Sequence, residues 1–145
     1  MKRLVEELQK IPEAAELLHC AGNGGCPAAM TGVGPVHRAH LCAALLEETG
    51  APELLLCSDE GEARRMAADM AAFTGISPVL LPPRELQFHA SAAASRAWEQ
   101  ERIAALYALA RGHAKIVVAT PDALFQRTFP QRLLLERTVA LEQGG

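Results

Sequence analysis

Three short, unbroken apolar runs recur along this chain, and long segments with helical spacing separate them. The runs are ELLLC at 53–57, SPVLL at 77–81 and KIVVA at 115–119. An apolar run of this length is typical of a parallel strand that is covered on both faces. Strands that alternate with helices form a mainly parallel sheet with right-handed crossovers. The sequence therefore predicts an α/β fold in which helices flank a mainly parallel sheet.

The predicted helices carry start and stop residues. A helix over 37–48 is closed by Gly50. After the first apolar run, Ser58 or Asp59 caps a helix that ends at Gly75. Apolar side chains recur at helical spacing in this second helix, and we expect them in the core: Met66, Met70 and Phe73.

The strongest helical pattern spans 95–112, with Ser95 as a candidate cap and Gly112 as terminator. One apolar stripe follows it: Trp98, Ile103, Leu106, Tyr107 and Ala110. Thr120 and Pro121 then begin another helix, since proline suits a first helical position.

Two weaker runs predict further strands, AAMTG at 28–32 and RTVALEQ at 137–143. We divide the chain into an N-terminal helical segment, an α/β domain, and the start of a further strand or inserted subdomain: 1–24, 25–135 and 136–145. Because the series stops on a strand with no helix after it, we expect the sequence to be a piece of a longer protein.

Between the first weak run and the helix over 37–48 lies TGVGPVHRAH, at the place of a phosphate-binding loop. Such a loop follows G-x-x-x-x-G-K-[ST], where Lys neutralises phosphate charge and the hydroxyl binds Mg²⁺. His37, Arg38 and Ala39 replace its second Gly, its Lys and its Ser/Thr. The residues of this degenerate phosphate loop are Gly32, Gly34, His37, Arg38 and Ala39.

Each replacement removes a different part of the chemistry. His37 adds bulk where glycine is needed, Arg38 has the wrong shape for the Lys position, and Ala39 cannot bind Mg²⁺. Pro35 also lacks an N–H for the phosphate cradle. We expect no Mg-ATP hydrolysis, no catalytic residue and no cofactor. Two alternatives stay open, a weak anion site at a helix N-terminus and a plain strand-to-helix turn.

The charge, hydropathy and cysteine pattern of the sequence argue against nucleic-acid binding, a membrane-spanning segment and a metal site. The net charge is −3, and no basic face of the kind that binds nucleic acid is evident. No apolar run could span a bilayer and the N-terminus is charged, so we expect a cytoplasmic protein without a membrane partner. Cys42 and Cys57 lie in apolar runs and are expected to be structural. The spacing of His19, Cys20 and Cys26 fits no common zinc site, so no metal is expected.

A working nucleotide-binding enzyme would need an acidic residue after a buried strand. Asp59 and Glu60 follow ELLLC and superficially resemble such a metal-binding end, but a helix cap and first-turn acid explain both. A hydrolase interpretation lacks the G-x-S-x-G nucleophile turn.

Three stretches in this order resemble a known family. They are PPREL at 82–86, the pattern from Arg102 to Leu109 and the pattern from Ile116 to Arg127. Together with the degenerate loop, they resemble the N-terminal module of the bacterial transcription-repair coupling factor, Mfd, which is itself similar to UvrB. The likeness covers roughly residues 25–143.

The resemblance implies a P-loop-NTPase-like fold similar to domain 1a of UvrB, with a non-catalytic role as scaffold or interaction module. The parent would be an ATP-dependent DNA translocase whose separate motor uses ATP and Mg²⁺ and displaces stalled RNA polymerase. It would recruit UvrA for nucleotide excision repair, mostly through a surface outside this chain. The implied partners are thus other domains of the same protein and UvrA, with RNA polymerase and DNA reached through the parent. UvrB has an aromatic-rich DNA-binding hairpin where this chain has only Phe88. The alternative is an NTPase or helicase fragment that retains weak ATP binding.

Overall fold

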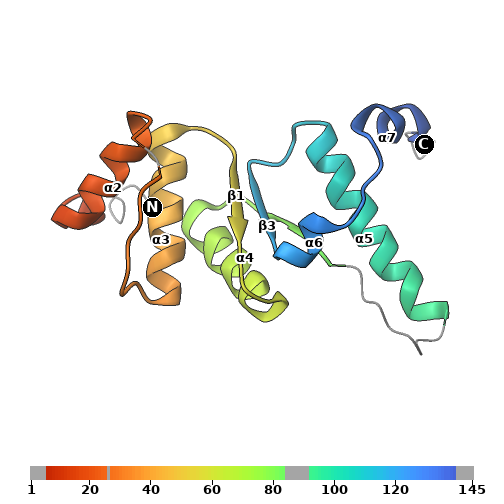
Figure 1. Cartoon of the computed structure of the whole chain (residues 1–145), viewed down its shortest axis with the longest axis horizontal. Coiled ribbons are helices and arrows are strands. Elements are labelled where there is room, and N and C mark those ends of the chain that lie inside the picture. Colours follow the sequence, from red (N-terminus) through yellow and green to blue (C-terminus); the bar gives the residue numbers. More distant parts are fainter. Residues whose placement is uncertain (1–5, 26, 84–91, 140–145) are drawn as a thin grey trace, which may run out of the picture.

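A computed structural model of the chain describes residues 6–25, 27–83 and 92–139, with side chains described outside 92–97. Figure 1 shows the order of its elements. Their bounds are α2 (Pro12–Gly22), α3 (Pro35–Thr49), β1 (Glu53–Leu56), α4 (Glu60–Thr74), β2 (Val79–Leu81), α5 (Ala92–Ala110), β3 (Ile116–Ala119), α6 (Pro121–Phe125) and α7 (Gln131–Arg137).

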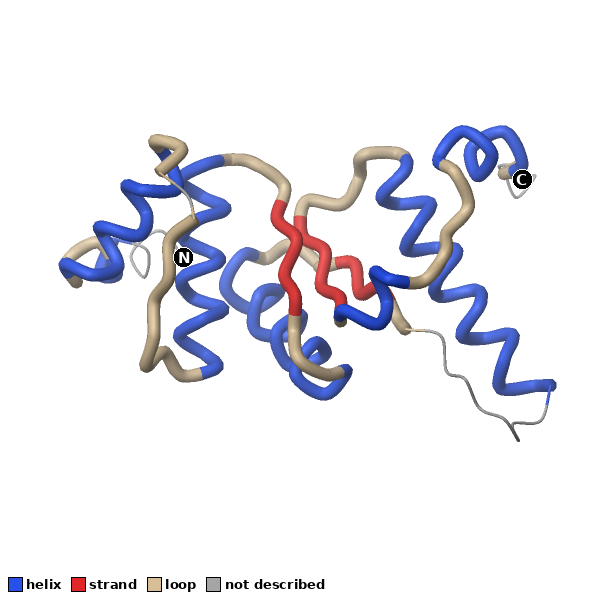
Figure 2. The backbone as a smooth tube through the Cα atoms, in the orientation of Figure 1, coloured by secondary structure: helices blue, strands red, loops and turns tan. Residues whose placement is uncertain are grey.

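The described strands form a parallel three-stranded sheet in the order β1-β3-β2. In the register of the central strand, Glu53 lies opposite Ile116 and Val79 lies opposite Val117. Figure 2 shows the sheet in the middle of an elongated molecule, with helices grouped on both sides of it. The predicted α/β class and the parallel sheet flanked by helices are therefore confirmed.

The larger core lies between one face of the sheet and the helices α3 and α4. Its largest fully buried side chains are Met70, Ile116 and Val118. Met66 and Phe73 pack against this cluster from α4, which confirms the predicted methionine-rich core face. Outside these layers, α2 packs on α3 through a smaller cluster that contains Leu17 and Leu41.

The opposite face of the sheet is covered only in part. A small cluster joins Leu81 and Ala119 to α5 and α6. On β1, Leu54 and Leu56 remain 54% and 57% exposed on this face, because α5 contacts β2 at the other edge of the sheet. The expectation that every strand is covered on both faces is correct for β3 and wrong for β1.

Several predicted helix ends agree with the structure. Asp59 caps α4, and its side chain accepts a hydrogen bond from the Glu62 N–H. Gly50 and Gly75 close α3 and α4 with φ of 64° and 72°, a region in which side chains other than glycine are strained. The predicted cap at Ser95 is wrong, since α5 already begins at Ala92.

Of the two weaker strand predictions, the first is wrong and the second is wrong in the part that the structure describes. Residues 28–32 are loop, because Ala28 and Ala29 are exposed while Met30 packs against the α2–α3 cluster instead of the sheet. In the predicted strand over 137–143, Arg137 ends helix α7, and the part from 140 on lies outside the described residues. The i,i+4 ion pair of Arg132 with Glu136 helps to explain why helix forms here. The three-part division of the chain stays a prediction.

Candidate functional site

The degenerate phosphate loop leads into α3 without a strand before it. A phosphate-binding loop joins a sheet strand to a helix, whereas the described residues 27–34 belong to no strand of the sheet. Gly32 has φ of 75°, and Gly34 precedes Pro35, the first residue of the helix. In the described residues, the turn thus has one left-handed glycine, Gly32, but lacks the strand that would hold it against a nucleotide.

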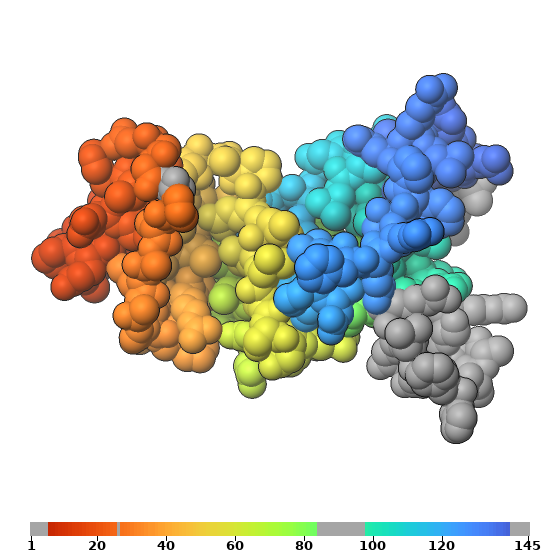
Figure 3. Space-filling model, viewed as in Figure 1, coloured from red at the N-terminus to blue at the C-terminus, as the bar shows by residue number. Residues whose placement is uncertain are grey.

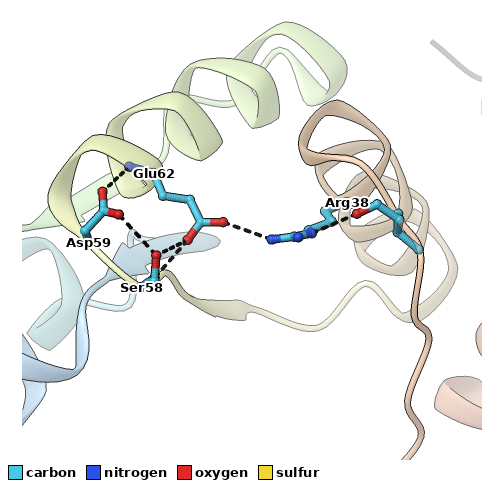
Figure 4. Close-up of polar contacts among 5 residues, drawn as sticks. Arg38, Ser58, Asp59 and Glu62 are labelled. Carbon is cyan, nitrogen blue, oxygen red and sulfur yellow. Dashed lines mark hydrogen bonds and ion pairs between the residues drawn. The ribbon is translucent and has the colours of Figure 1, made fainter.

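Arg38 lies in the first turns of α3, and its guanidinium is engaged within the protein. Its Nε donates to the carbonyl oxygen of Val33 at 3.1 Å, and its Nη1 lies 2.9 Å from Oε1 of Glu62. Figure 4 shows the guanidinium pointing across from α3 to the carboxylate on α4. The positive charge in the Lys position of the loop is therefore matched by a carboxylate of this chain.

Glu62 is held in place by the start of α4. Its Oε2 accepts hydrogen bonds from the Ser58 N–H at 2.9 Å and from the Ser58 hydroxyl at 2.7 Å, while its own N–H donates to Asp59 Oδ1 at 2.8 Å (Figure 4). The bonds from Ser58 lower the pKa of the Glu62 carboxyl, and the bond from the Glu62 N–H lowers the pKa of Asp59. Both groups are carboxylates at neutral pH, and Asp59 acts as a helix cap.

The structure also places the other two replaced positions of the loop, Ala39 and His37. Ala39, at the Ser/Thr position, is fully buried in the main core. His37 is exposed. The neighbouring His40 stacks on Phe73 of α4, with ring centroids 4.9 Å apart and an 8° angle between the planes. A residue at position 39 therefore faces side chains of the core and is not available to a bound metal ion.

No protein-family model, curated protein or solved structure matches this chain. The geometry around Arg38 and Glu62 is therefore the structural basis for a function of this chain.

A cavity of about 450 Å³ lies between the degenerate loop and β1. Met30 and Val33 line it from the loop, and Leu45 and Leu54 line it from α3 and the strand. Its lining is mainly apolar, and Arg38 is its cation, already paired with Glu62. The cation that lines the cavity is therefore one whose charge a carboxylate of this chain already offsets.

The residues considered as metal ligands do not assemble in the described part of the chain. There, no group of three or more His, Cys, Asp or Glu side chains is placed to hold a metal ion. His19 contacts the Asn23 amide, and Cys26 lies outside the described residues. Among the described helices, none is long and apolar enough to cross a membrane.

Glu62 was not singled out from the sequence, although a signal for it exists. Asp59 and Glu62 form a D-x-x-E spacing, which is typical of a capping box at a helix N-terminus. That spacing predicts the contact within α4. The contact with Arg38 depends on how α3 and α4 pack side by side, and it could not be predicted from spacing.

We expect the Arg38–Glu62 pair to contribute modestly to stability, because the Arg38 side chain is 52% exposed. In a double-mutant cycle of Arg38→Met and Glu62→Gln, the coupling free energy should be about 0.5–1 kcal/mol and should fall with added salt. Urea unfolding of the four proteins gives this value. The pair Arg64 and Glu60, wholly within α4, is the matched control and should give about 0.5 kcal/mol or less. A coupling near zero for Arg38 and Glu62 would contradict a structural role for their contact.

Glu53 predicts a pH dependence of stability. It begins β1, its Oε2 is buried without a hydrogen-bond partner, and burial raises the pKa of its carboxyl from 4.5 to about 7. The folded state binds the Glu53 proton more tightly than the unfolded state does, because the pKa of the carboxyl is raised on folding. The stability that this protonation contributes is fully present below pH 4.5 and is lost as the pH rises through about 7. The nearby Cys42 thiol has its pKa raised to about 11, first by burial and then by the Glu53 charge.

Glu53→Gln should therefore stabilise the protein, relative to the unsubstituted chain, by about 1–2 kcal/mol more at about pH 8.5 than at about pH 5. This difference in stabilisation is smaller than the full pKa shift would give, because Glu53 is only half-buried and solvent screens part of the effect. Urea unfolding at the two pH values measures it, with the exposed Glu47→Gln as control. Equal effects of Glu53→Gln at both pH values would show that the carboxyl titrates normally in the folded state.

Proposed function

We propose that this chain is a non-catalytic scaffold and interaction module of a transcription-repair coupling factor. The observation that carries the non-catalytic part is the pairing of Arg38 with Glu62, together with the burial of Ala39. At the position that would hold phosphate, Arg38 is a cation already paired with Glu62. At the position that would hold Mg²⁺, Ala39 presents only a methyl group, and this group is buried in the core. Arg38 then serves to join α3 to α4.

The coupling-factor part of the proposal is supported by the ordered motifs of the sequence. The pattern from Arg102 to Leu109 lies within α5, and the pattern from Ile116 to Arg127 runs through β3 and α6. In this proposal the parent protein is a cytoplasmic DNA translocase whose own motor uses ATP and Mg²⁺. Its partners are UvrA, RNA polymerase and DNA, and this module contacts mainly other domains of the same protein.

The alternative is a nucleotide-binding module that retains weak ATP binding. It is favoured by the positive φ of Gly32 and by the N-terminus of a 15-residue helix directly after the loop. Calorimetric titration with Mg-ATP to millimolar concentration separates the two. We expect no heat beyond dilution. Saturable binding that depends on Mg²⁺ and is lost in Arg38→Met would overturn the non-catalytic proposal.

The coupling-factor proposal has a separate test. The reading frame that encodes this chain should continue past Gly145 and encode helicase-type motor motifs. The full-length product should bind purified UvrA and should move along DNA when supplied with ATP. A stop codon directly after Gly145, or a product without a motor, would contradict the proposal and leave the non-catalytic conclusion intact.

A further inference from the structure

Arg102 of α5 is a buried cation, and within the part of the chain that the structure describes it has no carboxylate partner. The residue is only 7% exposed. Nη1 donates to the Pro82 carbonyl oxygen at 2.7 Å and Nη2 to the Ala123 carbonyl oxygen at 3.0 Å. In the described residues, no ion pair includes it. Buried charges in proteins are normally paired, and among the described residues no anion offsets the desolvation of this guanidinium.

Arg102 also lines a groove of about 760 Å³ between α5 and residues 126–129. In the space-filling view, the blue segment after β3 lies against the blue-green α5 on the right of the molecule (Figure 3). Arg127 and Phe129 line the groove from that segment, and Ile103 lines it from the helix. Ile103 and Phe129 are 48% and 63% exposed, which is high for large apolar side chains that border a cavity.

The groove is lined by both positively charged and apolar side chains, and this combination favours one class of ligand. Two arginines beside apolar walls suit a carboxylate next to a hydrophobic side chain. A nucleic-acid strand is less suited, because it would bring a series of phosphates into a groove that Glu99 also lines, whereas a peptide needs to place only one carboxylate against the two arginines. An acidic peptide segment with an apolar residue meets both requirements.

We propose that this groove binds an acidic peptide segment of a protein partner, with a carboxylate against Arg102 and Arg127 and an apolar side chain against Ile103 and Phe129. The site goes beyond the scaffold role and does not rest on the coupling-factor proposal. The groove is lined by α5 and residues 126–129. In Figure 1, α5 and α3, the helix that follows the degenerate loop, lie on opposite sides of the sheet.

The chain contains its own reporter for this site. Trp98 is the only tryptophan, it lines the groove, and its ring lies 6.0 Å from the Arg102 guanidinium carbon. The probes are the capped peptide Leu-Glu-Phe-Glu-Leu and its matched control Leu-Gln-Phe-Gln-Leu, titrated to millimolar concentration. Trp98 fluorescence and ¹H–¹⁵N amide shifts are the readouts. We expect saturable binding of the glutamate peptide, at least about tenfold tighter than the glutamine peptide.

Three exposed residues provide the variants, since Arg102 itself supports the fold. Arg127→Gln and Phe129→Ala should each weaken binding of the glutamate peptide by about fivefold or more. Arg111→Gln, at the residue directly after α5 and outside the groove, should leave it unchanged. Equal binding of both peptides, or no saturable change with the glutamate peptide, would overturn the proposal. So would tighter binding of a single-stranded thymidine oligonucleotide that Arg127→Gln weakens, which would assign the groove to nucleic acid.

Discussion

Replacing Arg102 by methionine is expected to lower the free energy of unfolding by about 2–3 kcal/mol. The substitution leaves the carbonyl oxygens of Pro82 and Ala123, both in buried residues, without the donors they now have. Hydrogen bonds from a charged donor are worth about 1.5–3 kcal/mol each. Relief of the desolvated charge offsets part of this loss, because burial already lowers the pKa of Arg102. The loss of the two bonds is the larger effect, so the net change is destabilising.

Urea unfolding followed by far-ultraviolet circular dichroism measures this change without relying on the neighbouring tryptophan. The control is Arg111→Met, at the residue directly after the same helix. Arg111 is exposed and lies over the Tyr107 ring, with its guanidinium carbon 5.7 Å from the centroid, so its loss should cost about 1 kcal/mol or less. Equal losses in the two variants would mean that the hydrogen bonds of Arg102 to Pro82, directly after β2, and to Ala123 of α6 do not stabilise the fold.

Met70→Ala is expected to cost about 2–5 kcal/mol, the range for truncation of a fully buried Met. Met70 has no exposed surface and belongs to the cluster that also contains Ile116 and Val118. Neighbours on α4 and β3 are fixed by the helix and the sheet, so they cannot move far enough to fill the space that the side chain leaves.

Met30→Ala is the matched control for that truncation. Met30 is half-buried and lines the existing cavity beside the loop, so its removal enlarges a space that is already open. We expect a cost of about 1 kcal/mol. Thermal or urea unfolding compares the two variants. If Met30→Ala costs as much as Met70→Ala, then the cluster around Met70 is not the main core.

The main strands and helices could be predicted because local signals specify them. The three apolar runs became the three described strands, and Asp59, Gly50 and Gly75 cap helices as their chemistry indicates. The weak run at 28–32 is loop, with Ala28 and Ala29 exposed and Met30 packed against the α2–α3 cluster. An apolar pattern is a property of one segment, whereas strand pairing in the sheet also depends on how the other segments of the chain pack.

The candidate site was only half predictable. Loss of the Lys and the hydroxyl is visible in the letters at positions 38 and 39. That Arg38 has a partner depends on residue 62, which is far from it in the sequence and near it only after α3 and α4 pack. The hydrogen bonds of Arg102 could not be predicted for the same reason. Their acceptors are backbone carbonyl oxygens at positions 82 and 123, which no side-chain pattern reveals. An arginine four residues from both Trp98 and Leu106, on a predicted apolar stripe, was the available signal for its burial.

The position of β3 in the sheet sets the order in which the protein can fold. The last described strand of the sequence lies between the two earlier ones, and every ladder of the described sheet includes it. On a ribosome, β1 and β2 must wait as unpaired apolar segments until residues 116–119 have been synthesised and have emerged. All sheet pairings then form over long sequence separations, which slows folding relative to the local helices. A nascent chain stopped before residue 116 can build α3 and α4 but has no partner for either strand, so it should be a target for chaperones and proteases.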